Sequence, residues 1–425
     1  MVENDKGTSL PNGHYQLTTL SNGLTVVTET LPHVRSVAFG VWSRAGSRDE
    51  EAGREGTAHF LEHMFFKGSE NRSAFDIAYE LEGKGGYLNA FTSKDHTCFY
   101  AHILDEHLPV AVDVLGDMLQ NPKLDPVELE REKQVVLEEI KTSNDTPDDW
   151  VHELFLMDLY GEHPLAHPVL GYDESVSGLD SGDLRSFIDS RYRNGNLLVA
   201  AAGSLVHEEV VDLVERTFSE RSSEDIEARI VIQPGRRGEE FLHYRDISQV
   251  HVLLGSQGLP HRHDDRYALV ILMNLLGGGM SSRLFQSLRE QRGLVYTVSS
   301  ITSFHEETGL AAFYLACAPE NARLALELIA GEIDAISRGG SVSEEELQSS
   351  REQVKGHIIL ALENTFPRMS RLAKGILFEE RILSIEETLE NIDAVTVDDM
   401  VRMAEEILRP EIITTTMLGA TKDVV

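Results

Sequence analysis

Five residues, His59-Phe60-Leu61-Glu62-His63, combine two imidazoles and a carboxylate at a spacing that suits metal chemistry. On a helix, His59 and His63 lie about one turn apart on the same face, so both rings can reach one ion. Glu62 can then approach a metal-bound water without being a ligand. The pattern H-x-x-E-H reverses the commoner zinc motif H-E-x-x-H and predicts a catalytic zinc site. The alternative is a buried helix whose histidines are ordinary core groups.

A zinc ion that also carries water needs a third protein ligand. The segment 126–142 reads as a helix rich in carboxylates, at positions 128, 130, 132, 138 and 139. Glu132 and Glu139 are seven residues apart and share a face, with Val135 and Val136 on or near it. Spacing alone does not choose Glu139 over Glu138, and most charge runs are only solvated helix faces.

The elements that would position these residues follow an alternation of strand and helix signals. Thr57 is a candidate N-cap for the helix that carries the histidines. In the first part of the chain we expect strands at 24–27, 36–41 and 197–202, a hairpin at 87–104, and helices at 57–66, 74–84, 108–119, 126–142 and 204–217. In the second part we expect strands at 250–255, 294–304 and 310–317, and helices at 266–276, 320–337 and 343–363.

The second part therefore repeats the first, which indicates a duplication. The segment ELEREKQVVLEEIKTSNDTP at 128–147 aligns with ELQSSREQVKGHIILALENTFP at 346–367. We expect an α+β fold of two related lobes, each a mostly antiparallel sheet packed with helices. The polar stretch 219–240 is the candidate linker between lobes at 1–218 and 241–425. Since no HFLEH occurs in the second half, one zinc per chain is expected, in the first lobe.

Composition narrows the function classes. The 425 residues carry a net charge of −33, so nucleic acid is a poor partner. The acidity fits either a solvated, salt-adapted surface or a cavity that prefers basic peptides. No run of eighteen apolar residues and no apolar N-terminal segment occurs, and Cys98 and Cys317 are the only cysteines and read as core residues. We therefore expect no membrane span and a reducing, cytoplasmic location.

The motif GTAHFLEHMFFKG is followed by VVLEEI, whose second Glu comes 76 residues after the last histidine. Together they resemble the pitrilysin family of inverzincin zinc peptidases. The likeness is greatest to the branch of the mitochondrial processing peptidase subunits and their bacterial homologues, and it covers nearly the whole chain. It implies that Glu139 is the third zinc ligand and that Glu132 assists the site. It also implies that Glu62 is the general base that activates the zinc-bound water.

The same resemblance assigns substrate-holding groups. Asn89-Ala90-Phe91-Thr92, on the first arm of the expected hairpin, matches the strand that binds peptide substrate by strand addition. Arg289 and Tyr296 match a pair that contacts substrate and the developing oxyanion. Without the resemblance, an ordinary buried hairpin explains the segment 89–92 better than substrate binding does. A surface Arg and a half-buried Tyr then explain Arg289 and Tyr296 as well as a substrate role does. The family's larger members join four such lobes, so a homodimer enclosing a chamber for unfolded peptides or short protein extensions is implied.

Three other functions compete with a zinc endopeptidase. The chain could be a non-catalytic scaffold subunit, like the respiratory-complex core subunits that resemble it. It could also be a peptide-binding chaperone, or a zinc hydrolase of another fold. The intact zinc motif together with Arg289 and Tyr296 favours a self-sufficient peptidase, and the duplication disfavours another fold.

Overall fold

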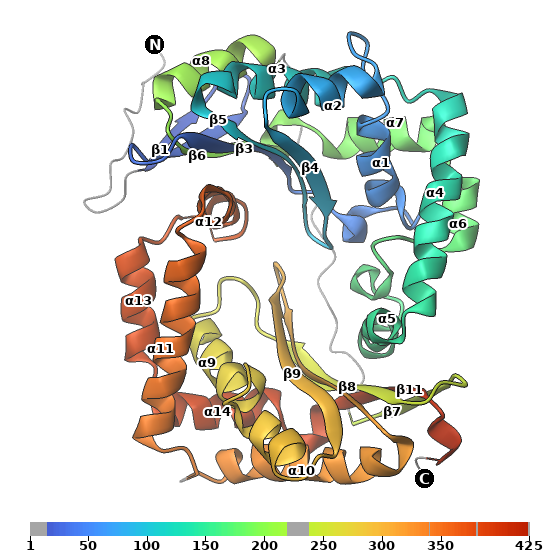
Figure 1. Ribbon diagram of the computed structural model, residues 1–425, viewed down its shortest axis with the longest axis vertical. Coiled ribbons are helices and arrows are strands. Elements are labelled where there is room, and N and C mark those ends of the chain that lie inside the picture. The colour runs from blue at the N-terminus through green and yellow to red at the C-terminus, as the bar shows by residue number, and fades with distance from the viewer. Residues whose placement is uncertain (1–14, 219–237, 340, 380, 424–425) are drawn as a thin grey trace. The chain divides into compact units, whose positions relative to one another are not determined.

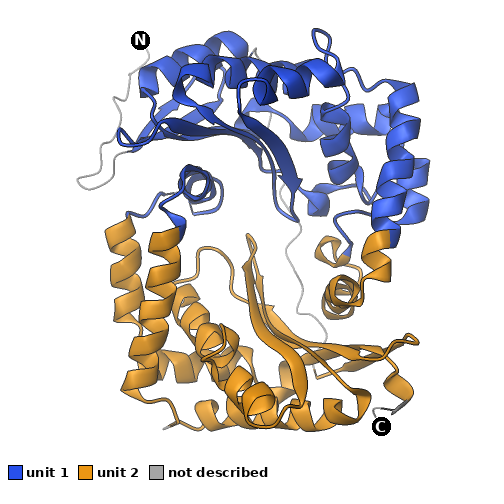
Figure 2. Cartoon of the chain, viewed as in Figure 1, with its two compact units in different colours: residues 1–141, 167–229, 361–384 blue, residues 142–166, 230–360, 385–425 orange. Residues whose placement is uncertain are grey.

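The computed structural model describes residues 15–218, 238–339, 341–379 and 381–423 (Figure 1). The chain forms two compact units (Figure 2). Unit 1 takes in Met1–Lys141, His167–Arg229 and Ala361–Ser384, and unit 2 takes in Thr142–Ala166, Ile230–Leu360 and Ile385–Val425. Each unit is built on its own sheet.

Unit 1 contains a six-stranded sheet in the order β1-β2-β6-β3-β5-β4. Strands β2 and β6 run parallel, and the other neighbouring strands run antiparallel. Most of these strands are rich in apolar residues because both faces of the sheet are covered. The strands are β1 (Tyr15–Thr19), β2 (Thr25–Thr30), β3 (Ser36–Ser43), β4 (Tyr87–Thr92), β5 (Thr97–Leu104) and β6 (Leu197–Gly203).

Alternation along the strands divides the buried side chains of this sheet between its two faces. Val37, Phe39 and Val41 of β3 belong to a large core together with helices of the first half of the chain. These helices bury an apolar stripe and leave their polar side to solvent. They are α1 (Thr57–Phe65), α2 (Ala74–Glu82), α3 (Leu108–Gln120), α4 (Pro126–Asp145), α6 (Asp173–Gly178), α7 (Ser181–Arg191) and α8 (His207–Thr217).

The opposite face of the same sheet is covered by α12 (Thr365–Phe378), which comes from the second half of the chain. Met369 of α12 packs over Gly40 of β3, where a Cβ atom would lie 3.0 Å from the Met369 sulfur. The buried carboxylate of Glu29 on β2 pairs with Arg368 at 2.6 Å and with Arg371 at 3.5 Å. Apolar packing and a buried ion cluster therefore both hold α12 on unit 1.

Unit 2 contains a five-stranded sheet in the order β7-β11-β8-β10-β9, with β7 and β11 parallel. Counted along the chain, the strands lie in the order first, fifth, second, fourth, third. Strands β2 to β6 of unit 1 follow the same order, so the two sheets share one topology. The strands are β7 (Glu240–Tyr244), β8 (Val250–Gly258), β9 (Val295–Phe304), β10 (Gly309–Cys317) and β11 (Thr414–Gly419).

In unit 2, as in unit 1, one face of the sheet is covered by a helix from the other half of the chain. One face of the sheet packs on α9 (Arg266–Gly277), α10 (Ala322–Ser337), α11 (Glu344–Ala361), α13 (Ile385–Ala394) and α14 (Val397–Ile407). The other face packs on α5 (Pro147–Tyr160), whose Phe155 joins Leu253 and Ala312 in a buried cluster. The Tyr160 hydroxyl also donates to the Gly309 carbonyl at 2.8 Å. The helix after α4 and the helix after α11 thus each cover the sheet of the other half.

The expected α+β fold of two related lobes is confirmed, including the hairpin and the aligned helices α4 and α11. The helices at 147–191 and 365–407 were missed. The candidate linker 219–240 falls largely outside the described residues, so it remains a prediction. The compact units do not coincide with the ranges 1–218 and 241–425, because residues 142–166 and 361–384 pack with the sheet of the other half. Within the described ranges, no helix is long and apolar enough to cross a membrane.

Candidate metal centre

Helix α1, which carries the two histidines, begins at a tight backbone contact. Gly56 precedes it with φ +94, and a Cβ atom there would lie 2.7 Å from the Leu170 carbonyl oxygen. Only glycine fits this left-handed and crowded position without strain. Thr57 is the first residue of the helix rather than its N-cap, and its hydroxyl donates to the Arg54 carbonyl at 2.6 Å. The expectation that Thr57 caps the helix is therefore wrong.

A carboxylate from the preceding turn accepts hydrogen bonds from backbone N–H groups at the start of α1 instead. Glu50 accepts from the backbone N–H groups of Gly56 at 2.8 Å and Ala58 at 2.7 Å. A carboxylate at this end also interacts favourably with the helix dipole. Sequence inspection missed Glu50, because it lies seven residues before the first helical residue and outside the usual capping spacing.

The structure brings His59, His63 and Glu139 together as a group able to hold a metal ion. Glu139 Oε2 lies 3.8 Å from His59 Nε2 and 3.5 Å from His63 Nε2, and the two rings are 4.8 Å apart between centroids. Ligand atoms that share one tetrahedral zinc at ~2.1 Å lie about 3.4 Å from each other. Two imidazoles and one carboxylate with these separations fit a zinc ion and leave a fourth position open.

The rotation of α4 decides which glutamate joins the imidazoles. Glu139 turns inward beside the buried Val136 and Ile140. Glu138 lies on the exposed side and pairs with Lys141 at 2.6 Å. The choice between Glu138 and Glu139 that spacing left open thus has a geometric answer.

The two histidines differ in what their second ring nitrogen contacts. His63 Nδ1 lies 3.2 Å from Glu132 Oε2, and Glu132 Oε1 lies 2.7 Å from the Lys67 ammonium. His59 Nδ1 is buried and has no hydrogen-bond partner among the described residues. Burial, and next the neighbouring His63 ring, lower the pKa of His59 to about 4. A neutral ring offers the lone pair that a metal requires.

Glu62 lies beside this group with one oxygen engaged. Its Oε2 accepts a hydrogen bond of 2.6 Å from the Thr92 hydroxyl on β4. Burial raises the pKa of Glu62, and the charge of Glu139 adds to the rise, whereas Thr92 and His63 oppose it. A carboxylate whose pKa is raised is a stronger base, as a proton acceptor in catalysis should be.

In the part of the chain that the structure describes, β4 is the last strand of its sheet. The Asn89 side-chain oxygen accepts from the Ala90 N–H at 2.8 Å, while its amide donates to the Tyr87 hydroxyl. Phe91 packs edge-on against Trp42 at 5.7 Å between ring centroids. The segment Asn89–Thr92 therefore lies on a sheet edge, and its last residue reaches Glu62.

Two further contacts fix the turn that follows β4, and sequence reasoning missed both. Arg48 and Asp95 form a buried ion pair of 2.8 Å. A Cβ atom on Gly46 would lie 2.3 Å from the Ser93 carbonyl oxygen, so the two backbones touch. Both contacts join residues 46–48 to the turn that comes directly after Thr92.

Arg289 and Tyr296 belong to unit 2. Arg289 lies in the last turn of a short π-helix, Phe285–Glu290. Its guanidinium carbon lies 4.8 Å from the Phe285 ring centre and 5.9 Å from that of Tyr296. Tyr296, near the start of β9, is 73% exposed rather than half-buried. Arg289 and Tyr296 are thus neighbours on the exposed surface of unit 2.

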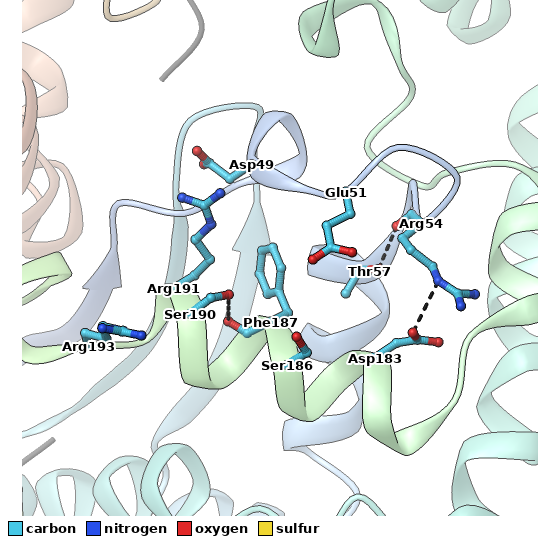
Figure 3. A pocket seen from close by; sticks show the side chains of 10 residues that line it. All are labelled: Asp49, Glu51, Arg54, Thr57, Asp183, Ser186, Phe187, Ser190, Arg191 and Arg193. Atoms are coloured by element: carbon cyan, nitrogen blue, oxygen red, sulfur yellow. Dashed lines mark hydrogen bonds and ion pairs between the residues drawn. The ribbon is translucent and has the colours of Figure 1, made fainter. Parts of the chain in front are cut away.

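A separate cavity of about 360 Å³ lies next to the start of α1 in unit 1 (Figure 3). It is lined by Thr57, by residues of the preceding turn and by residues of and just after α7. Arg54 and Asp183 form an ion pair of 3.2 Å in its wall. None of the candidate metal, catalytic or substrate residues lines this cavity.

Two family descriptions match the sequence. "Insulinase (Peptidase family M16)" matches residues 25–173, and "Peptidase M16 inactive domain" matches residues 178–354. A protein of Streptomyces coelicolor named an uncharacterized zinc protease is 39% identical over 97% of this chain and 91% of its own length. One of Bacillus subtilis with the same description is 38% identical over 92% of this chain and 94% of its own. The chain belongs to peptidase family M16, the pitrilysin and insulinase family.

Solved structures share the fold at lower identity. A protease from Helicobacter pylori superposes with a TM-score of 0.89 at 23% identity, over 96% of this chain and 100% of the other. A chain of complex III2 from Candida albicans superposes with a TM-score of 0.84 at 22% identity, over 96% and 97%. At these identities the likeness shows a shared fold alone.

Proposed function

We propose that this chain is a zinc metallopeptidase that hydrolyses peptide bonds with the centre formed by His59, His63 and Glu139. The observation that carries the proposal is the convergence of three neutral or anionic donors beside a fourth group, Glu62, that is not a ligand. Two histidines and one glutamate form a ligand set found in catalytic zinc sites. Membership of a peptidase family and relatives named zinc proteases support the same activity.

The residues divide the work as follows. His59, His63 and Glu139 would hold the zinc ion, which would supply a bound water of lowered pKa and polarise the substrate carbonyl. Glu62 then accepts the proton of the attacking water on a carboxylate oxygen and passes it to the leaving amine. The Thr92 hydroxyl donates a hydrogen bond to Glu62 Oε2 and so orients the carboxylate for this proton transfer.

The peptide substrate would add as a further strand along Asn89–Thr92. Among the described strands, β4 is at the edge of its sheet, which supports this, since a sheet edge supplies main-chain donors and acceptors. Arg289 and Tyr296, a cation and a phenol, would contact the substrate and the developing oxyanion. A homodimer would enclose the chamber, so that Arg289 and Tyr296 of one copy serve the centre of the other. Unfolded peptides or short protein extensions are the substrates such a chamber admits.

A scaffold subunit is the second candidate, because a respiratory-complex chain shares the fold. A scaffold has no use for a complete donor set, so the convergence of His59, His63 and Glu139 favours the enzyme. Metal analysis of the purified full chain, with digestion of a mixed peptide library with and without a chelator, separates the two. One zinc per chain and chelator-sensitive cleavage are expected. A protein that binds no zinc and cleaves nothing would overturn the proposal.

Replacing Glu62 by Gln tests the proposed base. The amide is nearly the same size but cannot take the proton, so hydrolysis should fall by about 10²-fold or more while zinc content stays unchanged. Zinc per chain and single-turnover peptide cleavage are the measurements. Wild-type turnover in Glu62→Gln would refute the role of Glu62 and leave the metal centre standing.

A further inference from the structure

Lys67 joins the metal centre through a buried carboxylate. Its ammonium lies 2.7 Å from Glu132 Oε1, while Glu132 Oε2 lies 3.2 Å from His63 Nδ1. The other nitrogen of the same ring, Nε2, faces Glu139 Oε2 at 3.5 Å. These contacts form one continuous series from Lys67 to the candidate ligands, and all of its members belong to unit 1.

Glu132 needs a positive partner. The residue is 5% exposed, and a buried carboxylate is costly unless it is paired and hydrogen-bonded. Each oxygen of Glu132 has a different neighbour, so the carboxylate cannot turn without losing one of them. Lys67 therefore supplies the charge and fixes the orientation of Glu132 at the same time.

The orientation of Glu132 matters because of what it imposes on His63. A carboxylate next to Nδ1 favours the tautomer with the proton on Nδ1, which leaves the Nε2 lone pair for a metal. His59 lacks such a partner among the described residues, since its Nδ1 is buried without a hydrogen bond. Within the described part of unit 1, His63 is thus the ligand whose tautomer the protein controls.

We propose that Lys67 is a positioning residue for the zinc centre, acting through Glu132 to hold His63 in the metal-binding tautomer and orientation. This inference rests on the proposed function. It goes beyond it by giving a role to the residue four positions after His63, which is neither a ligand nor a group that touches substrate. Lys67 acts on the affinity of the centre for its metal rather than on the chemical step.

The test compares zinc affinities of full-length variants by equilibrium competition with a chromophoric chelator. Lys67→Gln should weaken zinc binding by about 10- to 100-fold, the range found when partners of ligating histidines are lost. Lys67→Arg keeps the charge and should retain most of the affinity. Lys141→Gln is the matched control, because it removes the same charge from a pair with Glu138 that faces away from the centre. Its affinity should equal that of the wild type.

A double-mutant cycle shows whether Lys67 acts through Glu132. In a Glu132→Ala background, Lys67→Gln should cause little further loss, since the group it positions is gone. Equal losses in both backgrounds would overturn the inference. Thermal unfolding of the metal-free proteins checks folding. If Lys67→Gln fails to fold, Lys67→Met, which removes the charge and keeps an apolar stem of similar length, takes its place in the same cycle.

Zinc binding by the wild-type chain distinguishes a failure of the proposed function from a failure of the role of Lys67. If the wild-type chain binds no zinc, the proposed function fails. If the wild type binds zinc and Lys67→Gln binds it with equal affinity, only the role of Lys67 is refuted.

Discussion

Glu62 and Thr92 meet because a helix and a sheet edge approach each other within unit 1. The Thr92 hydroxyl donates to Glu62 Oε2, which leaves the other carboxylate oxygen for a proton. Residues 46–48 hold the adjacent turn through the buried pair of Arg48 and Asp95. Thr92 thus supports the proposed base as well as ending the proposed substrate strand.

Replacing Thr92 by Val should lower kcat by about tenfold, because a misplaced catalytic group loses much of its effect. Zinc content should not change, since Thr92 contacts no candidate ligand in the described structure. Thr92→Ser keeps the hydroxyl and should recover most of the rate. Steady-state kinetics with a peptide substrate, alongside metal analysis, check this. If kcat is unchanged in Thr92→Val, the hydrogen bond has no catalytic importance.

Residue spacing predicts only part of the proposed ligand set, and Glu139 came from the resemblance to a known family. His59 and His63 share a face through helix periodicity, which is local. The choice of Glu139 over Glu138 depends on how α4 is rotated against α1, and that follows from packing far along the chain. The contacts of Thr92 with Glu62 and of Lys67 with Glu132 are also long-range, so no spacing rule indicates them.

At the scale of elements, the same limit explains the missed helices. The strands of both sheets have strong apolar signals, and their order repeats, so the α+β class and the hairpin could be predicted. The segments 147–160 and 365–378 have weaker patterns, and sequence order does not say which sheet a helix covers. The packing of Met369 over Gly40 is visible only once α12 and β3 are in place.

Substituting Gly40 by Val should destabilise unit 1 by about 1–3 kcal/mol, because it overpacks the contact with α12. A Cβ atom added at Gly40 would lie 3.0 Å from the Met369 sulfur and 3.0 Å from Trp42 Nε1. Adding Met369→Ala should recover part of the loss by making room. Gly195→Ala, where no atom lies within 4 Å, is the control. Denaturant unfolding gives the free energy of unfolding of the wild type, the two single variants and the double variant. A free energy of unfolding that is unchanged in Gly40→Val would contradict the packing argument.

In unit 2, Glu346 should make stability depend on pH in acid. Arg283 binds both of its oxygens, at 2.9 and 3.0 Å, and helps hold the pKa of Glu346 down at about 2. Because the pKa is lower in the folded state, this stabilisation is complete above the unfolded value of ~4.3 and is lost as the pH falls toward 2. Unfolding curves of wild type and Glu346→Gln between those limits should converge as the pH falls. Parallel curves would show that the ion pair does not contribute.

At the scale of the whole molecule, the proposed homodimer predicts complementation between inactive copies. Glu62→Gln lacks the base but keeps Arg289, while Arg289→Ala lacks the cation but keeps the base. If each centre uses the Arg289 of the other copy, each mixed dimer has one working centre out of two and should show about half of the wild-type activity. When about half of the dimers are mixed, the whole sample should recover roughly a quarter. Mass measurement establishes that mixed dimers form, and peptide cleavage reports activity. Mixed dimers without activity would rule out action across copies.

The reciprocal placement of α5 and α12 has a consequence for how this polypeptide can be dissected. A fragment that stops at residue 218 would present Val27, Ala38 and Trp42 to water, because the helix that shields them is encoded some 150 residues later. Expressing the two halves of the chain separately should therefore yield aggregation-prone fragments rather than two stably folded domains. Each half of the chain therefore depends on one helix encoded in the other half to cover an apolar face of its sheet.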